Sequence, residues 1–300
     1  KISETMGVTL RICRRSSLFR FGPGATGVCW AKARCYVQPM PHAAINGQQI
    51  YFEDTGGEGP AVILGHGFLM DHEMFVHQVA ALRDGYRVIT WDERGFGLTE
   101  FDGKPFTYWD SAADCLGVLD HLGIDRAVVG GMSQGGYLSL RVALTAPQRV
   151  RALILLDSGA ALDPPETLAA NQGMVDMWLA VGPVDDLAAA VAAIIIDDPA
   201  ENPKWVAKWQ ARAKELMAEP ARCMLTRDDV SGRLGEITCP ALVVHGTEDT
   251  AITMEHAEEM AHDLVGCGGV VKVAGAHAAN LTNPEPVNAA ILDFLAGLPA

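Results

Sequence analysis

The chain has no long hydrophobic run and little positive charge. Its longest apolar stretch, residues 187–196, spans ten residues, whereas a transmembrane helix needs about 20. Lys and Arg number 23 against 37 Asp and Glu, which gives a formal net charge of -14. Nucleic acids and anionic membrane surfaces attract basic proteins, so this charge argues against both as partners.

Cysteines are few, and none has the CxxC spacing. The seven are Cys13, Cys29, Cys35, Cys115, Cys223, Cys239 and Cys267. No disulfide framework or zinc site is indicated, so we expect reduced thiols in a cytoplasmic protein. Internal repeats and low-complexity linkers are also absent.

Residues 1–39 differ from the rest of the chain. They contain seven basic residues and one acidic residue, and they show no helical or strand periodicity. No compact apolar segment is present, which excludes a secretory signal peptide. A transit peptide is a weaker alternative, because no amphipathic helix emerges. We expect a non-native or dispensable leader, with a natural start at Met40.

From residue 40 onward, apolar runs alternate with helical patterns. A fully apolar run is typical of a parallel strand that is covered on both faces. Such runs occupy residues 61–64, 87–91, 127–129, 152–156 and 241–244. Helical patterns separate them at residues 73–82, 108–122 and 134–144. This alternation predicts an α/β fold with a mostly parallel central sheet flanked by helices.

The alternation stops between residues 160 and 230. This segment is rich in Ala, Met and Trp, contains no strand-like run, and is broken by prolines. About seventy residues is too long for one crossover connection. We therefore expect a helical cap at residues 160–230, inserted into a core made of residues 40–159 and 231–300.

One motif points directly to chemistry. Gly131-x-Ser133-x-Gly135 follows an apolar run and precedes a helical pattern. This is the nucleophile-elbow pattern, in which a serine lies on a sharp strand-to-helix turn and small neighbours let the two backbones approach. The helix that follows directs its N-terminal N–H groups toward the site, where negative charge develops during acyl transfer. The motif predicts Ser133 as a nucleophile.

Other polar residues follow the carboxyl ends of the predicted strands, where open parallel sheets bind ligands. They are His66, Asp92, Glu93, Asp157, His245, Glu248, Asp249 and His277. The predicted topology gathers them with Ser133 at one edge of the sheet.

From Met40 to its C-terminus, the chain resembles the α/β-hydrolase family. The resemblance rests on His66-Gly67, the loop at residues 92–97 (Asp-Glu-Arg-Gly-Phe-Gly), the Ser133 elbow, Gly246-x-x-Asp249 and His277. These motifs occur in the family's order of nucleophile, acid and histidine. The segment at residues 277–285 is similar to the ending of 3-oxoadipate enol-lactonase-like enzymes. Small-cap esterases and cofactor-free haloperoxidase-like enzymes are the other similar groups.

The resemblance implies a role for each matching residue. Ser133 attacks the acyl carbon, His277 moves the proton, and Asp249 orients the imidazole. Backbone N–H groups of Phe68 and Gln134 hold the oxyanion. No metal and no cofactor are implied.

Several of these assignments have alternatives. Asp157 also ends a strand, and some relatives take their acid there. Asp228 and Asp229 lie just past the cap, where a helix cap or a solvated turn is the simpler role. We expect His66 to be structural and Arg94 to form a local ion pair or turn. The candidates for substrate contacts are Met132, Trp178, Trp205 and Trp209, with packing of the cap core as the alternative for the three Trp residues.

The residues at and near the predicted site disfavour several reaction types and one substrate class. Serine at the elbow disfavours the alkyl displacement of dehalogenases and epoxide hydrolases, which use Asp there. Ala278 stands where carbon–carbon bond hydrolases usually have Trp. Beyond Arg212, Arg222 and Arg227 no arginine clamp is evident, so a diacid substrate is not supported.

We therefore expect a serine hydrolase that cleaves apolar carboxylic esters or lactones through an acyl-enzyme. The alternatives are a cofactor-free perhydrolase or haloperoxidase-like enzyme, a carbon–carbon bond hydrolase, and a ligand-binding protein on a hydrolase scaffold. Assembly into a homo-oligomer is left open.

Overall fold

The computed structural model describes residues 42–299. The expectation of a dispensable leader at residues 1–39 lies outside these residues and stays a prediction. In the described part of the chain, no helix is both long and apolar enough to span a bilayer.

Eight strands form one sheet, in the order β1-β2-β4-β3-β5-β6-β7-β8. Their bounds are β1 His42–Ile45, β2 Gln48–Asp54, β3 Ala61–Gly65, β4 Arg87–Trp91, β5 Ala127–Met132, β6 Val150–Leu156, β7 Ala241–Gly246 and β8 Cys267–Val273. Strands β3 to β8 pair in parallel with one another, whereas β2 pairs antiparallel with both β1 and β4. The predicted mostly parallel α/β sheet is confirmed.

Helices cover both faces of the sheet. Their bounds in the core are η1 His72–Phe75, α1 Val76–Leu82, α2 Tyr108–His121, α3 Gln134–Thr145, η2 Pro147–Arg149, η4 Ser231–Glu236, α8 Met254–Asp263, α9 Ala279–Thr282 and α10 Pro284–Ala296. Side chains alternate along each strand. Ile63 accordingly packs in the cluster that contains α2, α3 and α8, whereas Val62 and Leu64 pack in the cluster that contains α1 and α10. Burial on both faces explains why these strands are apolar throughout.

Strand β1 has no counterpart among the predicted strands. It forms a hairpin with β2 that turns at Asn46 and Gly47, whose φ angles are 47° and 82°. Two positive φ values are typical of a type I′ turn, for which Asn-Gly is a preferred sequence. The Asn46-Gly47 pair was therefore a signal for this hairpin.

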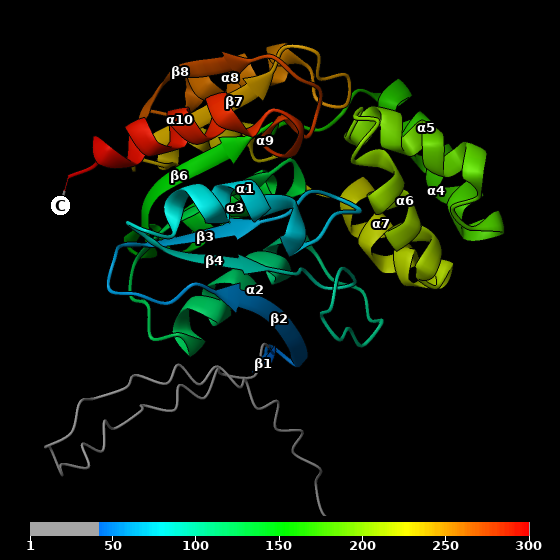
Figure 1. The fold of residues 1–300 in the computed structure, drawn as a ribbon, viewed down its shortest axis with the longest axis horizontal. Coiled ribbons are helices and arrows are strands. Elements are labelled where there is room, and N and C mark those ends of the chain that lie inside the picture. Colours follow the sequence, from blue (N-terminus) through cyan, green and yellow to red (C-terminus); the bar gives the residue numbers. More distant parts are fainter. Residues whose placement is uncertain (1–41, 300) are drawn as a thin grey trace, which may run out of the picture. The chain divides into compact units, whose positions relative to one another are not determined.

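A helical insertion lies between β6 and β7. It comprises α4 Pro165–Val181, α5 Asp185–Ile195, α6 Asn202–Ala211, η3 Lys214–Met217 and α7 Ala218–Leu225. Figure 1 shows these helices beyond the arrowheads of the parallel strands, at their carboxyl ends. The insertion therefore stands over the sheet edge where the predicted site residues lie.

Candidate active site

Ser133 lies on the turn between β5 and α3. Its backbone has φ 50° and ψ -114°, a strained combination that a non-glycine residue adopts only when its surroundings impose it. The Ser133 N–H donates to the carbonyl of Leu156 on the neighbouring strand β6, at 2.8 Å. A Cβ atom at Gly135 would collide with the carbonyl oxygen of Gly65. The glycine of the motif thus permits the close approach of α3 to β3 that holds Ser133 in place.

His277 and Asp249 form a hydrogen-bonded pair. Nδ1 of His277 lies 2.8 Å from Oδ2 of Asp249. The other Asp249 oxygen, Oδ1, accepts the N–H groups of Ala251 at 2.8 Å and Ile252 at 3.0 Å. Because a carboxylate oxygen accepts a hydrogen bond, Asp249 is set to hold the Nδ1–H tautomer of His277. The Nε2 atom then carries the free lone pair.

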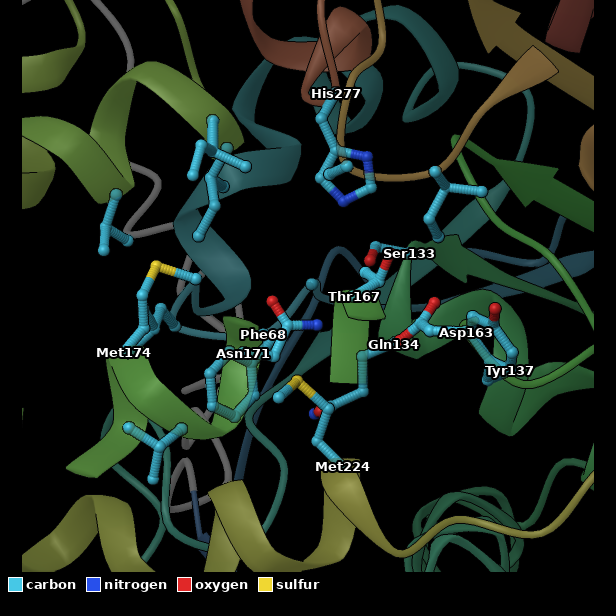
Figure 2. Close-up of a pocket in the computed structure, with 18 of the residues that line it drawn as sticks. Phe68, Ser133, Gln134, Tyr137, Asp163, Thr167, Asn171, Met174, Met224 and His277 are labelled. Atoms are coloured by element: carbon cyan, nitrogen blue, oxygen red, sulfur yellow. The ribbon is translucent and has the colours of Figure 1, made fainter. Parts of the chain in front are cut away.

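Ser133 and His277 line the same cavity. Its volume is about 350 Å³, at the lower end of the usual range for small-molecule sites. Figure 2 shows the imidazole of His277 and the side chain of Ser133 directed into this space. The candidate nucleophile and the candidate base therefore line one pocket, which is large enough for a small organic substrate.

Phe68 and Gln134 line the same cavity as Ser133. Among the hydrogen bonds of residues 42–299, neither the Phe68 N–H nor the Gln134 N–H donates to a protein acceptor. Gln134 is the first residue of α3, so its N–H is one of the free donors at a helix N-terminus. Both groups are available to an oxygen bound beside Ser133.

Asp157, the rival acid, makes different contacts. It ends β6 with φ 46°, and its Oδ1 accepts the Gly246 N–H at 2.7 Å. No hydrogen bond joins it to His277 in the described residues. Complete burial, and next to it the charge of Asp249, raise the pKa of the Asp157 carboxyl well above its usual value. Asp157 therefore ties the end of β6 to β7, and the shift favours its neutral form.

The other polar candidates lie in local structural contacts. Asp228 pairs with Arg141 at 2.8 Å, and Arg94 pairs with Asp114. The side chain of Asp229 accepts the backbone N–H of Ser231 at 2.7 Å, next to η4.

The three arginines considered as a carboxylate clamp are also engaged. Arg212 donates to the carbonyl of Gly95 at 2.8 Å, and Arg222 to Glu219 at 2.6 Å. Arg227 is the one that lines the cavity, and it pairs with Asp163 at 2.9 Å. A substrate carboxylate would thus have to compete with a protein carboxylate for Arg227.

The candidate substrate contacts divide into two groups. Met132 and Trp178 line the cavity, but Trp205 and Trp209 do not. These two take the alternative role of packing. Nε1 of Trp209 donates to the carbonyl of Leu69 at 2.8 Å, and Trp205 packs beneath Lys208, whose Nζ lies 4.3 Å from the ring centroid. Helix α6 therefore uses its tryptophans to pack against the core rather than to face the site.

Helix α4 contributes a face to the lining, of which sequence reasoning named only Trp178. Thr167, Asn171, Met174 and Trp178 all line the cavity and recur with the helical period of three to four residues. Figure 2 shows Thr167, Asn171 and Met174 among the residues around the cavity. The periodicity was readable in the sequence, but the direction in which this face points was not.

One cluster in residues 42–299 has ligand types that a metal could use, namely Asp157, His245 and Asp249. Nε2 is the histidine nitrogen that faces this cluster, at 3.3 Å from Oδ2 of Asp249, while Nδ1 has no hydrogen-bond partner among the described residues. Both carboxylates accept backbone N–H groups, and Nε2 of His245 lies 2.8 Å from the carbonyl of Ile252, to which it must donate. A metal ligand needs a free lone pair, so this donor set does not fit a metal ion.

Comparison with known proteins places this architecture in one family. The model of the family described as "alpha/beta hydrolase fold" matches residues 60–284. The chain belongs to the α/β-hydrolase fold family. The resemblance inferred from the motifs is confirmed, and with it the fold.

Within this family, esterases and lactonases are among the similar proteins. A thermophilic esterase from Thermogutta terrifontis is 29% identical, with a TM-score of 0.77 over 87% of this chain and 98% of its own. The enol-lactonase from Burkholderia xenovorans LB400 is 28% identical, with a TM-score of 0.78 over 85% of this chain and 100% of its own. A Synechocystis sp. protein whose name assigns it to the non-heme chloroperoxidases is 28% identical over 85% of this chain and 100% of its own.

Proposed function

We propose that this α/β-hydrolase is a serine hydrolase that cleaves carboxylic esters or lactones through an acyl-enzyme. The observation that carries the proposal is the shared cavity of Ser133 and His277, in which the imidazole is held at Nδ1 by the buried Asp249. A serine hydroxyl is a weak nucleophile unless a base takes its proton, and a base works best when a third group fixes its tautomer.

In the proposed reaction, Oγ of Ser133 attacks the acyl carbon while Nε2 of His277 takes the Oγ proton. The carbonyl oxygen becomes an oxyanion, which accepts the N–H groups of Phe68 and Gln134. When the tetrahedral intermediate collapses, the bond to the leaving oxygen breaks and His277 returns its proton to that oxygen. Water then repeats the sequence on the acyl-enzyme, releasing the acid and restoring Ser133.

The cavity lining supports an apolar acyl or alcohol group. The helical insertion contributes aliphatic, methionine and aromatic side chains to the lining, among them Met174, Val175, Trp178, Ile194 and Ile195. Methionine side chains adapt to differently shaped ligands, so we expect several related esters or lactones to be accepted. The esterase and the enol-lactonase among the similar structures support the same substrate class.

Labelling and turnover test the proposal together. A fluorophosphonate probe should modify Ser133 in the wild type and nothing in Ser133→Ala, and a panel of p-nitrophenyl esters and lactones should be hydrolysed only by the wild type. Labelling without turnover of any ester or lactone would contradict ester hydrolysis. Adding hydrogen peroxide to the active enzyme then tests the perhydrolase alternative, since peroxide would attack the same acyl-enzyme in place of water. If the probe does not label Ser133 and no ester or lactone is hydrolysed, a ligand-binding protein is favoured.

A further inference from the structure

A chain of buried hydrogen bonds joins the two proposed oxyanion donors behind the cavity. Glu93, in the loop after β4, is at its centre. The Glu93 backbone N–H donates to Nε2 of His66 at 3.0 Å, and its side-chain Oε2 accepts Nε2–H of Gln134 at 2.9 Å. One residue thus contacts both sides of the site.

The first branch runs through His66 to Phe68. Because Nε2 of His66 accepts a hydrogen bond, the ring proton is on Nδ1, which lies 2.8 Å from the carbonyl oxygen of Gly67. Burial lowers the pKa of His66, which keeps the ring neutral, as this arrangement requires. The Gly67 carbonyl and the Phe68 N–H belong to one planar peptide unit. Holding the oxygen of that unit therefore sets the direction of its N–H, and the hydrogen bond also polarises it.

The second branch runs through the side chain of Gln134. Its Nε2 donates to Glu93, and its Oε1 accepts the hydroxyl of Tyr108 at 3.0 Å. Both ends of the side-chain amide are held, which fixes the rotamer of Gln134 at the start of α3. Gln134 is also the residue that offers the second backbone N–H.

Because these residues are buried, the loss of one of their hydrogen bonds is costly. His66 and Glu93 are completely buried, and Gln134 and Tyr108 are 3% exposed. A polar group lost from such a network leaves its partner unpaired, because water cannot replace it. Burial, and beside it the charges of Asp114 and Asp92, raise the pKa of Glu93 well above its usual value. A neutral carboxyl accepts the Gln134 amide without placing a negative charge near the developing oxyanion.

We propose that Glu93 is a positioning residue that aligns the N–H groups of Phe68 and Gln134 on the oxyanion, through His66 on one side and through the Gln134 side chain on the other. The inference rests on the proposed function. It assigns to Glu93 no contact with the substrate.

The side-chain branch can be tested with two neutral replacements of similar size. Glu93→Gln keeps an oxygen that accepts the Gln134 amide, whereas Glu93→Leu removes it. For p-nitrophenyl butyrate we expect Glu93→Leu to lower kcat by about 10- to 100-fold and to change KM less than about twofold. This fall in kcat does not exceed the one expected when a whole oxyanion donor is removed. Glu93→Gln should stay within about threefold of the wild type.

A transition-state analogue separates positioning from a general structural effect. An aliphatic trifluoromethyl ketone adds to the serine and places its oxyanion between the two donors, so its Ki should rise in Glu93→Leu by the same factor by which kcat falls. In a Gln134→Ala background, Glu93→Leu should lower kcat less than about threefold, because the side chain acts through Gln134. Should Glu93→Leu not fold, Gln134→Met breaks the same bond from its other end and carries the same kcat and Ki expectations.

Three results would overturn the role of Glu93: a wild-type kcat in Glu93→Leu, a fall in kcat with an unchanged Ki, or additive effects with Gln134→Ala. Each of these requires an active wild type that a fluorophosphonate labels at Ser133. A wild type that is neither labelled nor active would instead overturn the proposed function, and this inference with it.

Discussion

The Oδ2 atom of Asp249 lies 2.8 Å from the Nδ1 atom of His277, and the Asp249 side chain is completely buried. A second buried carboxyl, Asp157, lies close enough that its pKa is raised partly by the charge of Asp249. Two adjacent buried carboxyls cannot both ionise without cost. Asp249 accepts the backbone N–H groups of Ala251 and Ile252 in addition to its contact with His277, and the raised pKa of Asp157 favours the protonated form of that carboxyl.

This arrangement predicts unequal effects of two matched substitutions. Asp249→Asn should lower kcat by orders of magnitude, because an amide at this position favours the wrong imidazole tautomer. Asp157→Asn should cost less than about tenfold, since an amide oxygen can still accept the Gly246 N–H. Steady-state kinetics on one ester measures both, with melting temperatures to show that each variant is folded. The reverse order of effects would assign the acid to β6.

The raised pKa of Asp157 also predicts a pH dependence of stability. In the unfolded chain this carboxyl titrates near 3.9, so above about pH 4 the unfolded state releases a proton that the folded state keeps. Folding then takes up a proton, and this group makes the protein less stable as pH rises from about 4 toward the folded-state pKa.

Asp157→Asn removes that proton uptake. Urea unfolding of the wild type and the variant is measured at half-unit steps between pH 4 and pH 8. The unfolding free energy of Asp157→Asn should rise relative to that of the wild type as pH rises. A difference that stays constant over this range would mean that Asp157 is ionised in the folded protein.

Two tryptophans of the helical insertion form a matched pair for substrate selection. Trp178 lines the cavity and Trp205 does not, although both are 4% exposed. Either Trp→Ala change should destabilise the protein by about 3–5 kcal/mol. Only Trp178→Ala should enlarge the cavity and shift the preference toward longer acyl chains. The ratio of kcat/KM for p-nitrophenyl octanoate and acetate measures this shift, and an equal ratio in both variants would contradict the role of Trp178.

The leader remains a prediction about the part of the chain outside the described residues. A chain that starts at Met40 should melt within a few degrees of the full chain and keep its kcat, because residues 1–39 show no helical or strand periodicity. Differential scanning calorimetry and ester hydrolysis test this expectation. A large drop in melting temperature would show that residues 1–39 contribute to the fold.

The sequence by itself determined the fold class and the tight turn that holds Ser133. Fully apolar strands indicate a sheet covered on both faces, and the glycines around Ser133 indicate a tight turn, because only glycine tolerates the close approach of Gly135 to Gly65. Both signals are local, so a short stretch of chain contains them completely.

Tertiary structure alone decided which acid faces His277 and which tryptophan faces the cavity. Asp157 and Asp249 follow neighbouring parallel strands, and nothing local to either residue states which carboxylate the imidazole of His277 will reach. Trp178, Trp205 and Trp209 all lie on buried helix faces. Helical periodicity gives such a face but not the rotation of the helix against its neighbours, which depends on how distant segments of the chain pack together.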